Sequence, residues 1–186
     1  MGRLTVEQIV SADGYAADES GGLDFFLAAG SVDPADPDQI AFLEQVDAIL
    51  LGANTYRMFA DYWPNADPAA EPVAEPINRL PKFVVSNSLE RAPWGDGEIE
   101  ILGGDAADSV AALKRRTDSI VVWGSFTLTD ALFRAGLVDV LRLRIVPVLI
   151  GAGRPFTPAD LGDRPLTLDH TVAHPSGHIG TTYVIR

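Results

Sequence analysis

The sequence predicts an α/β fold built on a mostly parallel β-sheet, with an antiparallel hairpin at the carboxyl end. Short apolar runs without alternation, at residues 48–51, 82–85 and 120–123, are typical of strands covered on both faces. After residue 123 the order strand, glycine turn, helix, strand indicates a crossover unit of such a sheet. Residues 166–186 contain two alternating stretches around Pro175-Ser176-Gly177, which indicates the closing hairpin.

Periodicity and turn residues place the remaining elements. We expect strands at residues 3–10, 48–51, 82–85, 98–102, 120–123 and 138–148, and helices at about 23–27, 37–46, 55–62, 106–116 and 126–135. The loop between the first strand and residue 38 is long and polar, and such loops are more often functional than accidental. Residues 63–81, rich in Pro, Ala and Glu, predict an irregular or partly helical excursion.

Side chains able to cap a helix precede three of the predicted helices. The candidate caps are Asn54 or Thr55, Asp105 or Asp108, and Ser125 or Thr127. Gly136 can end the last of these helices.

Composition excludes several classes of function. Among 186 residues, 14 basic side chains stand against 26 acidic ones, and the net charge of −12 repels nucleic acid and anionic lipid. Backbone amides and one or two local arginines can still bind a phosphate-bearing cofactor. With no cysteine, disulfides and thiolate chemistry are excluded. We expect one cytoplasmic domain over residues 1–186, because the amino terminus alternates and no apolar run approaches about 18 residues.

Small residues follow four of the predicted inner strands: Gly52, Ser86, Gly103-Gly104 and Gly124-Ser125. If these strands are parallel, their carboxyl ends meet at one edge of the sheet, where ligands of such folds bind. Glycine gives room and backbone amides give donors, so the pattern favours a nucleotide-type cofactor. The alternative is that glycine and serine are simply common at strand ends.

Other candidate motifs do not support a site. Gly151-Ala152-Gly153 resembles a dinucleotide fingerprint, but Arg154-Pro155 follows where a helix should begin. The three histidines, His170, His174 and His178, are spaced by four residues. Pro175 and Gly177 exclude the helix that this spacing would need, although His174 and His178 can face each other across a hairpin. We therefore predict no metal site.

The sequence lacks motifs that are typical of hydrolases: it has no Gly-x-Ser-x-Gly elbow and no P-loop. Hydride transfer requires less of the protein, because the cofactor carries the chemistry.

Several stretches, in this order, are similar to one known family. They are Ser11-Ala12-Asp13-Gly14-Tyr15, residues 47–52 with Thr55-Tyr56, Tyr62-Trp63-Pro64, residues 80–86, Val122-Trp123-Gly124-Ser125, Gly136-Leu137-Val138-Asp139 and residues 147–151. They resemble the reductase domain at the carboxyl end of the bifunctional riboflavin-biosynthesis deaminase-reductase, and its stand-alone relatives. The resemblance covers nearly the whole chain, without the zinc-deaminase half. It implies a dihydrofolate-reductase-like three-layer fold with about eight strands, helices on both faces and a homodimer.

The resemblance also implies a cofactor site for NADPH, with NADH not excluded. Gly52, Asn54 and Thr55 would lie near the pyrophosphate, Ser86, Asn87 and Gly103 towards the adenosine, and Gly124, Ser125, Phe126 and Thr127 at the diphosphate and nicotinamide end. The substrate would be a small heterocycle, such as a 5-amino-6-ribosylamino-pyrimidine or a pterin.

Two aspartates are the candidate catalytic residues implied by the resemblance. Asp13 would border the nicotinamide and the substrate mouth. Asp24 is similar in placement to the acid with which dihydrofolate reductases hold the pterin, and its alternative role is a helix cap. The proton would come from Asp24 or from water.

Two positions depart from the family pattern. Ala53-Asn54 stands where relatives carry a basic residue, so Arg57, Arg91 or another arginine would have to bind a 2′-phosphate. Val140 follows Asp139, at the position where relatives have a glutamate. A non-catalytic nucleotide-binding or ligand-sensing module on the same fold is therefore the alternative function.

Overall fold

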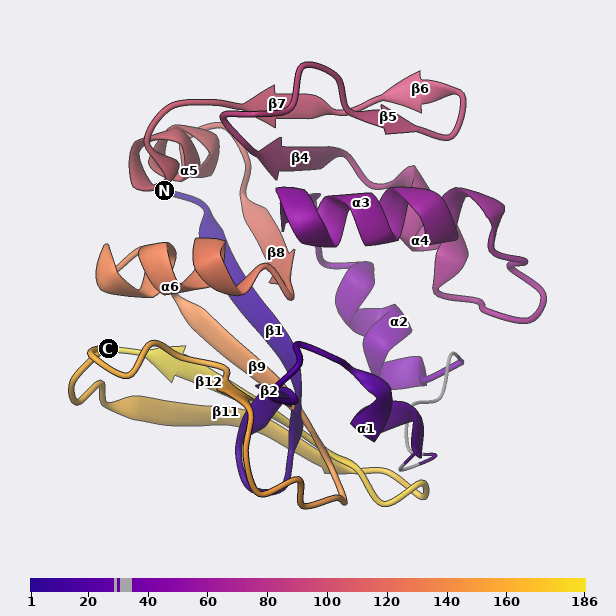
Figure 1. The fold of residues 1–186 in the computed structure, drawn as a ribbon, viewed down its shortest axis with the longest axis vertical. Coiled ribbons are helices and arrows are strands. Elements are labelled where there is room, and N and C mark those ends of the chain that lie inside the picture. The colour runs from indigo at the N-terminus through magenta and orange to yellow at the C-terminus, as the bar shows by residue number, and fades with distance from the viewer. Residues whose placement is uncertain (29, 31–34) are drawn as a thin grey trace.

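The computed structural model describes residues 1–28, 30 and 35–186 and is organised around an eight-stranded sheet (Figure 1). Its order is β11-β12-β9-β1-β8-β3-β4-β7, with β12 antiparallel to β9 and to β11 and the other neighbours parallel. The strands are β1 (Arg3–Ser11), β3 (Ala48–Gly52), β4 (Lys82–Val85), β7 (Glu100–Leu102), β8 (Ser119–Trp123), β9 (Val140–Val146), β11 (Leu166–Ala173) and β12 (Ile179–Ile185). The predicted mostly parallel sheet with an antiparallel hairpin is confirmed.

The inner strands are apolar throughout because both faces of the sheet are covered. In β3, Ala48 and Leu50 join one core cluster while Ile49 and Leu51 join the other, and all four are at most 1% exposed. Each of the three larger side chains, Ile49, Leu50 and Leu51, contributes roughly 1.5–3 kcal/mol through the hydrophobic effect.

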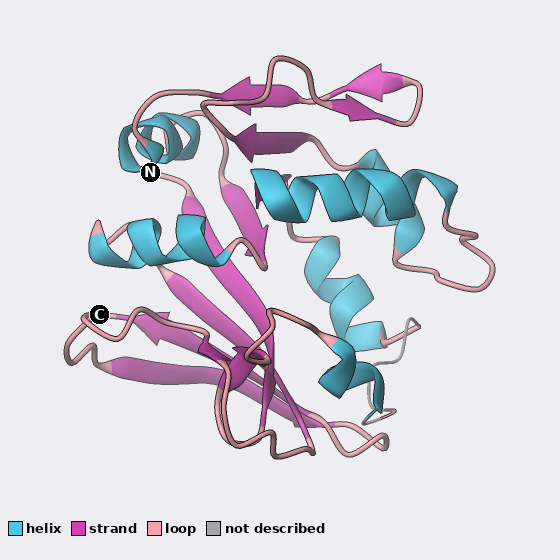
Figure 2. Ribbon diagram, viewed as in Figure 1, coloured by secondary structure: helices cyan, strands magenta, loops and turns pink. Residues whose placement is uncertain are grey.

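Helices form a layer on each side of the sheet (Figure 2). The first core cluster lies under α5 (Ala106–Lys114) and α6 (Phe126–Arg134). The second lies under α2 (Pro37–Leu43), α3 (Ala53–Tyr62) and α4 (Ala74–Arg79). The result is the three-layer arrangement that the sequence predicted.

Several short helices and strands lie outside the eight-stranded sheet. Helix α1 (Asp24–Ala28) lies in the long loop as expected, and η1 (Trp63–Asn65) and α4 make the excursion at 63–81 partly helical. Two short antiparallel pairs were not predicted: β2 (Tyr15–Ala17) with β10 (Arg154–Pro155), and β5 (Pro93–Trp94) with β6 (Gly97–Glu98).

Some predicted bounds differ from the structure. Strand β9 is shorter than predicted at both ends; before it, Asp139 accepts from Leu4 N at 2.7 Å and pairs with Lys114 at 2.5 Å. Strand β7 begins only at Glu100, because Gly97 and Glu98 pair with β5 instead. Helix α2 ends at Leu43 rather than 46.

Only one of the three predicted helix caps forms a side-chain cap. Asp105 accepts hydrogen bonds from the amides of Ala107 and Asp108 at 2.9 and 3.0 Å. Helix α3 has Gly52 at its N-cap, so Asn54 and Thr55 lie inside the helix. Ser125 occupies the N-cap of α6 without a capping bond, because its hydroxyl is used by neighbouring strands. No helix among the described residues is both long and apolar enough to cross a membrane.

Candidate functional site

The carboxyl ends of four parallel strands form one row. Gly52 pairs with Val85, Val85 pairs with Leu102, and Leu50 pairs with Val122, which places Gly124 beside Gly52. At a spacing of about 4.8 Å per strand, the row spans about 15 Å. The segments predicted to meet at one edge of the sheet therefore do so.

The ends of β3 and β8 are joined by side-chain hydrogen bonds. Ser125 Oγ accepts from Gly52 N at 2.8 Å and donates to the carbonyl of Trp123 at 2.8 Å. Thr55 Oγ1 accepts from Ser125 N at 2.9 Å. These polar contacts explain why hydroxyl residues occupy the positions where capping was predicted.

Glycine packs closely against its neighbours at two points of this junction. Gly124 has a φ of 52°, and a Cβ there would lie 3.0 Å from Thr55 Oγ1. A Cβ on Gly52 would lie 3.3 Å from Ser125 Cβ. A side chain at Gly124 would be strained by the left-handed backbone as well as crowded, whereas a Cβ at Gly52 would require Ser125 to shift by a few tenths of an ångström.

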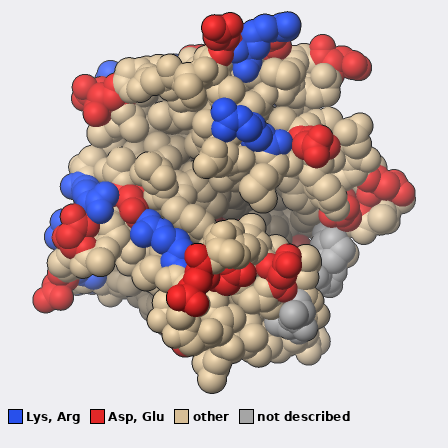
Figure 3. Space-filling model, in the orientation of Figure 1, with Lys and Arg blue, Asp and Glu red and all other residues tan. Residues whose placement is uncertain are grey.

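Helices α3 and α6 both begin at this junction. The first amides of a helix lack partners within the helix, and they favour a bound anion. Asn54, in the first turn of α3, is exposed. Phe126, which is partly buried, and Thr127, which is exposed, form the first turn of α6. Figure 3 shows a hollow, mostly without charged side chains, at the centre of this face, between the places of α3, α6 and α1 in Figure 1.

The ends of β4 and β7 are fixed in a similar way. Asn87 donates to the carbonyl of Gly104 at 3.1 Å and accepts from its amide at 2.6 Å. Ser86 Oγ accepts from the amides of Ser88 and Leu89 at 3.2 and 3.1 Å. A Cβ on Gly103 would meet nothing closer than 3.7 Å. The side chains of Ser86 and Asn87 thus shape the loops at this edge.

Asp13 fixes the loop after β1. Its carboxylate accepts from Ser11 Oγ at 2.6 Å, from Gly151 N at 2.7 Å and from Ile150 N at 3.3 Å. These hydrogen bonds, led by that of Ser11, lower the pKa of Asp13 below its usual value. Asp13 is therefore suited to orienting groups and ill suited to donating a proton.

Asp24 is the first residue of α1 and is exposed to solvent. A carboxylate is favoured by the helix dipole in the first turn, so the position fits the helix-terminus role and leaves the side chain accessible to a ligand.

Two arginines considered for phosphate binding have different surroundings. Arg57, exposed on the first part of α3, donates to Asn54 Oδ1 at 3.0 Å. Arg91 is bound to Glu98, to whose Oε1 its Nε donates at 2.6 Å. A solvent-open depression of about 530 Å³ lies between α3 and the turn after β5, and its lining includes Arg57 but none of the other candidate cofactor residues. The other candidate cofactor residues lie instead along the row of strand ends.

Buried polar residues behind the edge were missed in the sequence. Gln8, 4% exposed, donates to the carbonyl of Gly124 at 2.8 Å. Glu7, also 4% exposed, accepts from Trp123 Nε1 at 3.1 Å and from Gln39 Nε2 at 2.9 Å, and lies 3.0 Å from Arg142 Nε. Burial raises the pKa of Glu7, against the opposing effect of nearby guanidinium groups. In the sequence Glu7 and Gln8 appear only as part of the alternating pattern of residues 3–10, which does not show that both side chains are buried.

Comparison with known proteins agrees with this architecture. A family model described as the RibD C-terminal domain matches residues 3–179. A Bacillus subtilis protein named as the uncharacterized protein YyaP is 28% identical over 159 residues, covering 83% of this chain and 79% of that protein.

Solved structures show the same fold. A putative riboflavin biosynthesis protein from a Shewanella species has a TM-score of 0.77 at 22% identity, with 99% of each chain covered. A deaminase and 5-amino-6-(5-phosphoribosylamino)uracil reductase from Thermotoga maritima has a TM-score of 0.70 at 14% identity; all of this chain matches 57% of that one. Dihydrofolate reductase from Enterococcus faecalis, complexed with NADP(H), has a TM-score of 0.58 at 14% identity, covering 100% of this chain and 97% of that one. The predicted dihydrofolate-reductase-like fold is thus confirmed.

Proposed function

This chain belongs to the RibD C-terminal domain family, and we propose that it is a stand-alone NADPH-dependent oxidoreductase. The observation that carries the proposal is the junction of Gly52, Thr55, Gly124 and Ser125. There, two glycines packed closely against Ser125 and Thr55 stand at the start of two helices and carry no side chain that could cover the first helical amides. Such a backbone surface fits a diphosphate, which needs close approach and amide donors more than it needs charged side chains.

The remaining candidate residues fit the same ligand along the row of strand ends. Asn54, Phe126 and Thr127 would flank the diphosphate and nicotinamide end, while Ser86, Asn87 and Gly103 would border the adenosine. Bound NADPH supplies the hydride. Arg57 is the cation that best fits a 2′-phosphate, because Asn54 holds it near the start of α3.

The substrate we propose is a small heterocycle of the ribosylamino-pyrimidine or pterin type, bound beside the 14–38 loop. Part of that loop, residues 29 and 31–34, lies outside the described residues. Asp13 would orient the substrate mouth and Asp24 or water would donate the proton. Val140 pairs with Thr5 and Val184 at the amino end of β9, opposite the proposed cofactor edge. We therefore expect its departure from the family pattern to leave the proposed cofactor site unaltered.

Titration with NADPH and with NADH tests the proposal. Trp123 immediately precedes Gly124, so binding should quench tryptophan fluorescence. Oxidation of NADPH, measured as the loss of its absorbance at 340 nm, should then be observed with a pterin or a ribosylamino-pyrimidine. Absence of binding of both nucleotides at millimolar concentration would refute the cofactor assignment.

A non-catalytic nucleotide-binding or ligand-sensing module is the second candidate. The state of Asp13 favours this candidate. Its carboxylate accepts a hydrogen bond from Gly151 N and its pKa is lowered, so Asp24 is the remaining candidate acid for proton transfer. Binding of NADPH without oxidation across a panel of pterins, pyrimidines, flavins and quinones would support the module. An Asp24→Asn variant that keeps NADPH binding and loses turnover would support the enzyme.

We also propose a cytoplasmic homodimer. Strand β11 is an edge of the sheet, and Leu166, Leu168 and Ile179 on the terminal hairpin are 43%, 54% and 43% exposed. Unpaired strand edges with exposed apolar side chains are ready to associate. Sedimentation at micromolar concentration should give twice the chain mass, and a Leu168→Glu variant should sediment as a monomer.

A further inference from the structure

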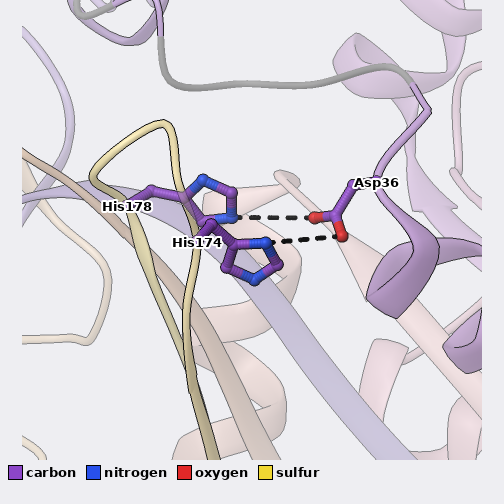
Figure 4. A group of neighbouring side chains, drawn as sticks. All are labelled: Asp36, His174 and His178. Atoms are coloured by element: carbon purple, nitrogen blue, oxygen red, sulfur yellow. Dashed lines mark ion pairs between the residues drawn. The ribbon is translucent and has the colours of Figure 1, made fainter.

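All three histidines of the chain lie against the start of α2. His174 Nδ1 is 3.6 Å from Asp36 Oδ1, and His178 Nε2 is 3.6 Å from Asp36 Oδ2 (Figure 4). His170 Nε2 is 3.8 Å from Asp38 Oδ1. The imidazoles come from the hairpin of β11 and β12, and the carboxylates come from the segment that begins α2.

The hairpin brings His174 and His178 together. His174 N donates to the carbonyl of His178 at 3.0 Å, and the rings stack with centroids 3.8 Å apart. The side chains of His178 and Asp36 are 1% exposed and that of His174 is 11% exposed. Two imidazoles thus direct nitrogens at one buried carboxylate.

The donor set and its spacing suit a divalent transition metal. One nitrogen from each histidine and one oxygen of Asp36 all lie within 4.8 Å of one another. In a tetrahedral zinc site, with bonds of about 2.0–2.2 Å, the ligand atoms lie about 3.3–3.5 Å apart. Small side-chain rotations would therefore close the three groups around an ion.

The neighbouring groups orient the donors as in known metal sites. Ser176 Oγ lies 2.8 Å from His178 Nδ1, which fixes one ring nitrogen and turns Nε2 towards Asp36. Asp36 accepts from Asp38 N and from Arg144 Nη2, both at 3.0 Å, and two carboxylate oxygens can accept further contacts.

The charged groups around Asp36, His174 and His178 do not oppose the binding of a cation. Glu7, Asp36 and Asp38 face only two guanidinium groups, those of Arg142 and Arg144. The two aspartates balance the two guanidinium groups, so the described carboxylates and guanidinium groups of this cluster sum to no net positive charge.

We propose that Asp36, His174 and His178 form a three-ligand site for Zn²⁺ or a similar divalent transition metal, with water in the fourth position. The ion would fasten the terminal hairpin to the start of α2. The proposal replaces the sequence-based expectation of no metal site, which could not foresee the approach of Asp36. It does not depend on the proposed reductase function.

The test uses chelator-treated, metal-free protein. Calorimetric titration should show one Zn²⁺ per chain with a Kd below about 10 μM, and Co²⁺ should give the visible absorption of a low-coordinate site. Zn²⁺ at 100 times its Kd should raise the Tm by about 5–10 °C. His178→Gln and Asp36→Asn should abolish both effects. His170→Gln, which removes the histidine outside the trio, should leave them unchanged.

Wild-type protein that binds no Zn²⁺ below 100 μM would overturn the proposal and leave Arg144 as the sufficient partner of Asp36. Equal losses in His170→Gln and His178→Gln would overturn it as well. If His178→Gln fails to fold, His174→Gln, at the more exposed position, provides the same comparison, and zinc binding retained there would also be decisive against the site.

Discussion

Gly124 combines a left-handed backbone with a crowded neighbourhood, and Gly136 has the first property without the second. Their φ values are 52° and 66°, but a Cβ on Gly136 would meet nothing within 4 Å. We expect Gly124→Ala to lower the free energy of unfolding by about 2–3 kcal/mol and Gly136→Ala by about 1 kcal/mol. Only the former should weaken NADPH binding, by tenfold or more. Chemical denaturation and fluorescence titration measure both effects, and equal NADPH affinity in the two variants would contradict the assigned site.

Arg57 gives a second prediction at the level of one side chain. If its guanidinium binds the 2′-phosphate, Arg57→Ala should weaken NADPH binding by about tenfold and leave NADH binding nearly unchanged. Arg91→Ala is the matched control, because Arg91 is an exposed arginine already paired with Glu98. Competitive titration with both nucleotides measures the ratio of affinities. A similar loss for both nucleotides would assign Arg57 to general positioning of the cofactor.

Among single residues, the sequence indicates which small residues end the strands, but it does not indicate which polar residues are buried. Gly52, Ser86 and Gly124 could be identified because a short apolar strand precedes each. Gln8 could not, because its contact with the Gly124 carbonyl joins residues 116 positions apart. Ser125 and Thr55 were predicted as helix caps because their local spacing favours a cap. In the structure both hydroxyls instead accept hydrogen bonds from the backbone of another element.

Glu7 connects four elements through its buried carboxylate, since its partners lie on α2, β8 and β9. Glu7→Gln keeps an acceptor for Trp123 but removes the negative charge beside Arg142. We expect the free energy of unfolding to fall by about 2 kcal/mol at pH 7, because Arg142 loses one of its two carboxylate partners and keeps Asp38. The loss should grow as pH falls through the raised pKa of Glu7, because the folded wild type then takes up a proton that glutamine cannot bind and only the wild type gains stability.

Glu98→Gln is the control for this change. Its ion pair with Arg91 is exposed, with 78% and 48% of the two side chains accessible, so its removal should cost less than about 1 kcal/mol. Urea denaturation of the three proteins at pH 5 and pH 7 makes the comparison. Equal stabilities of the two variants at pH 7 would show that the Glu7 network contributes no more than a surface pair.

Long elements were predictable and the shortest were not. Uniform apolar runs indicate β3 and β8 because each side chain is buried in one of two cores. The pairs β5–β6 and β2–β10 involve strands of two or three residues, too few to show a period, and β10 lies far from β2 in the sequence. Helix α2 ends early because the amides of Gln45 and Val46 donate to carbonyls three residues back, a change of hydrogen bonding that apolar spacing does not encode.

For the molecule as a whole, the order of elements and the family resemblance were enough to predict the layers and the antiparallel hairpin. They also indicated which strand ends meet, because parallel topology fixes that edge. They could not indicate the charged cluster of Glu7, Asp36, Arg142 and Arg144, because its members come from three separate segments. Charge pairing across a fold leaves no local pattern.

The pH dependence of global stability should report one buried cation. Burial lowers the pKa of Lys82 from 10.5 to about 8, and its ammonium donates to Asn78 O at 2.9 Å. Between these pKa values the unfolded chain binds more protons than the folded one, so the free energy of unfolding rises with pH. We expect a gain of about 1–1.5 kcal/mol from pH 8 to pH 9.5. The window ends there because the raised pKa values of Tyr56 and Tyr62 reverse the trend near pH 10. Urea denaturation at several pH values measures the slope, which Lys82→Met should remove and Arg115→Met, the loss of an exposed cation, should retain. The same slope in Lys82→Met as in the wild type would mean that another group is responsible for it.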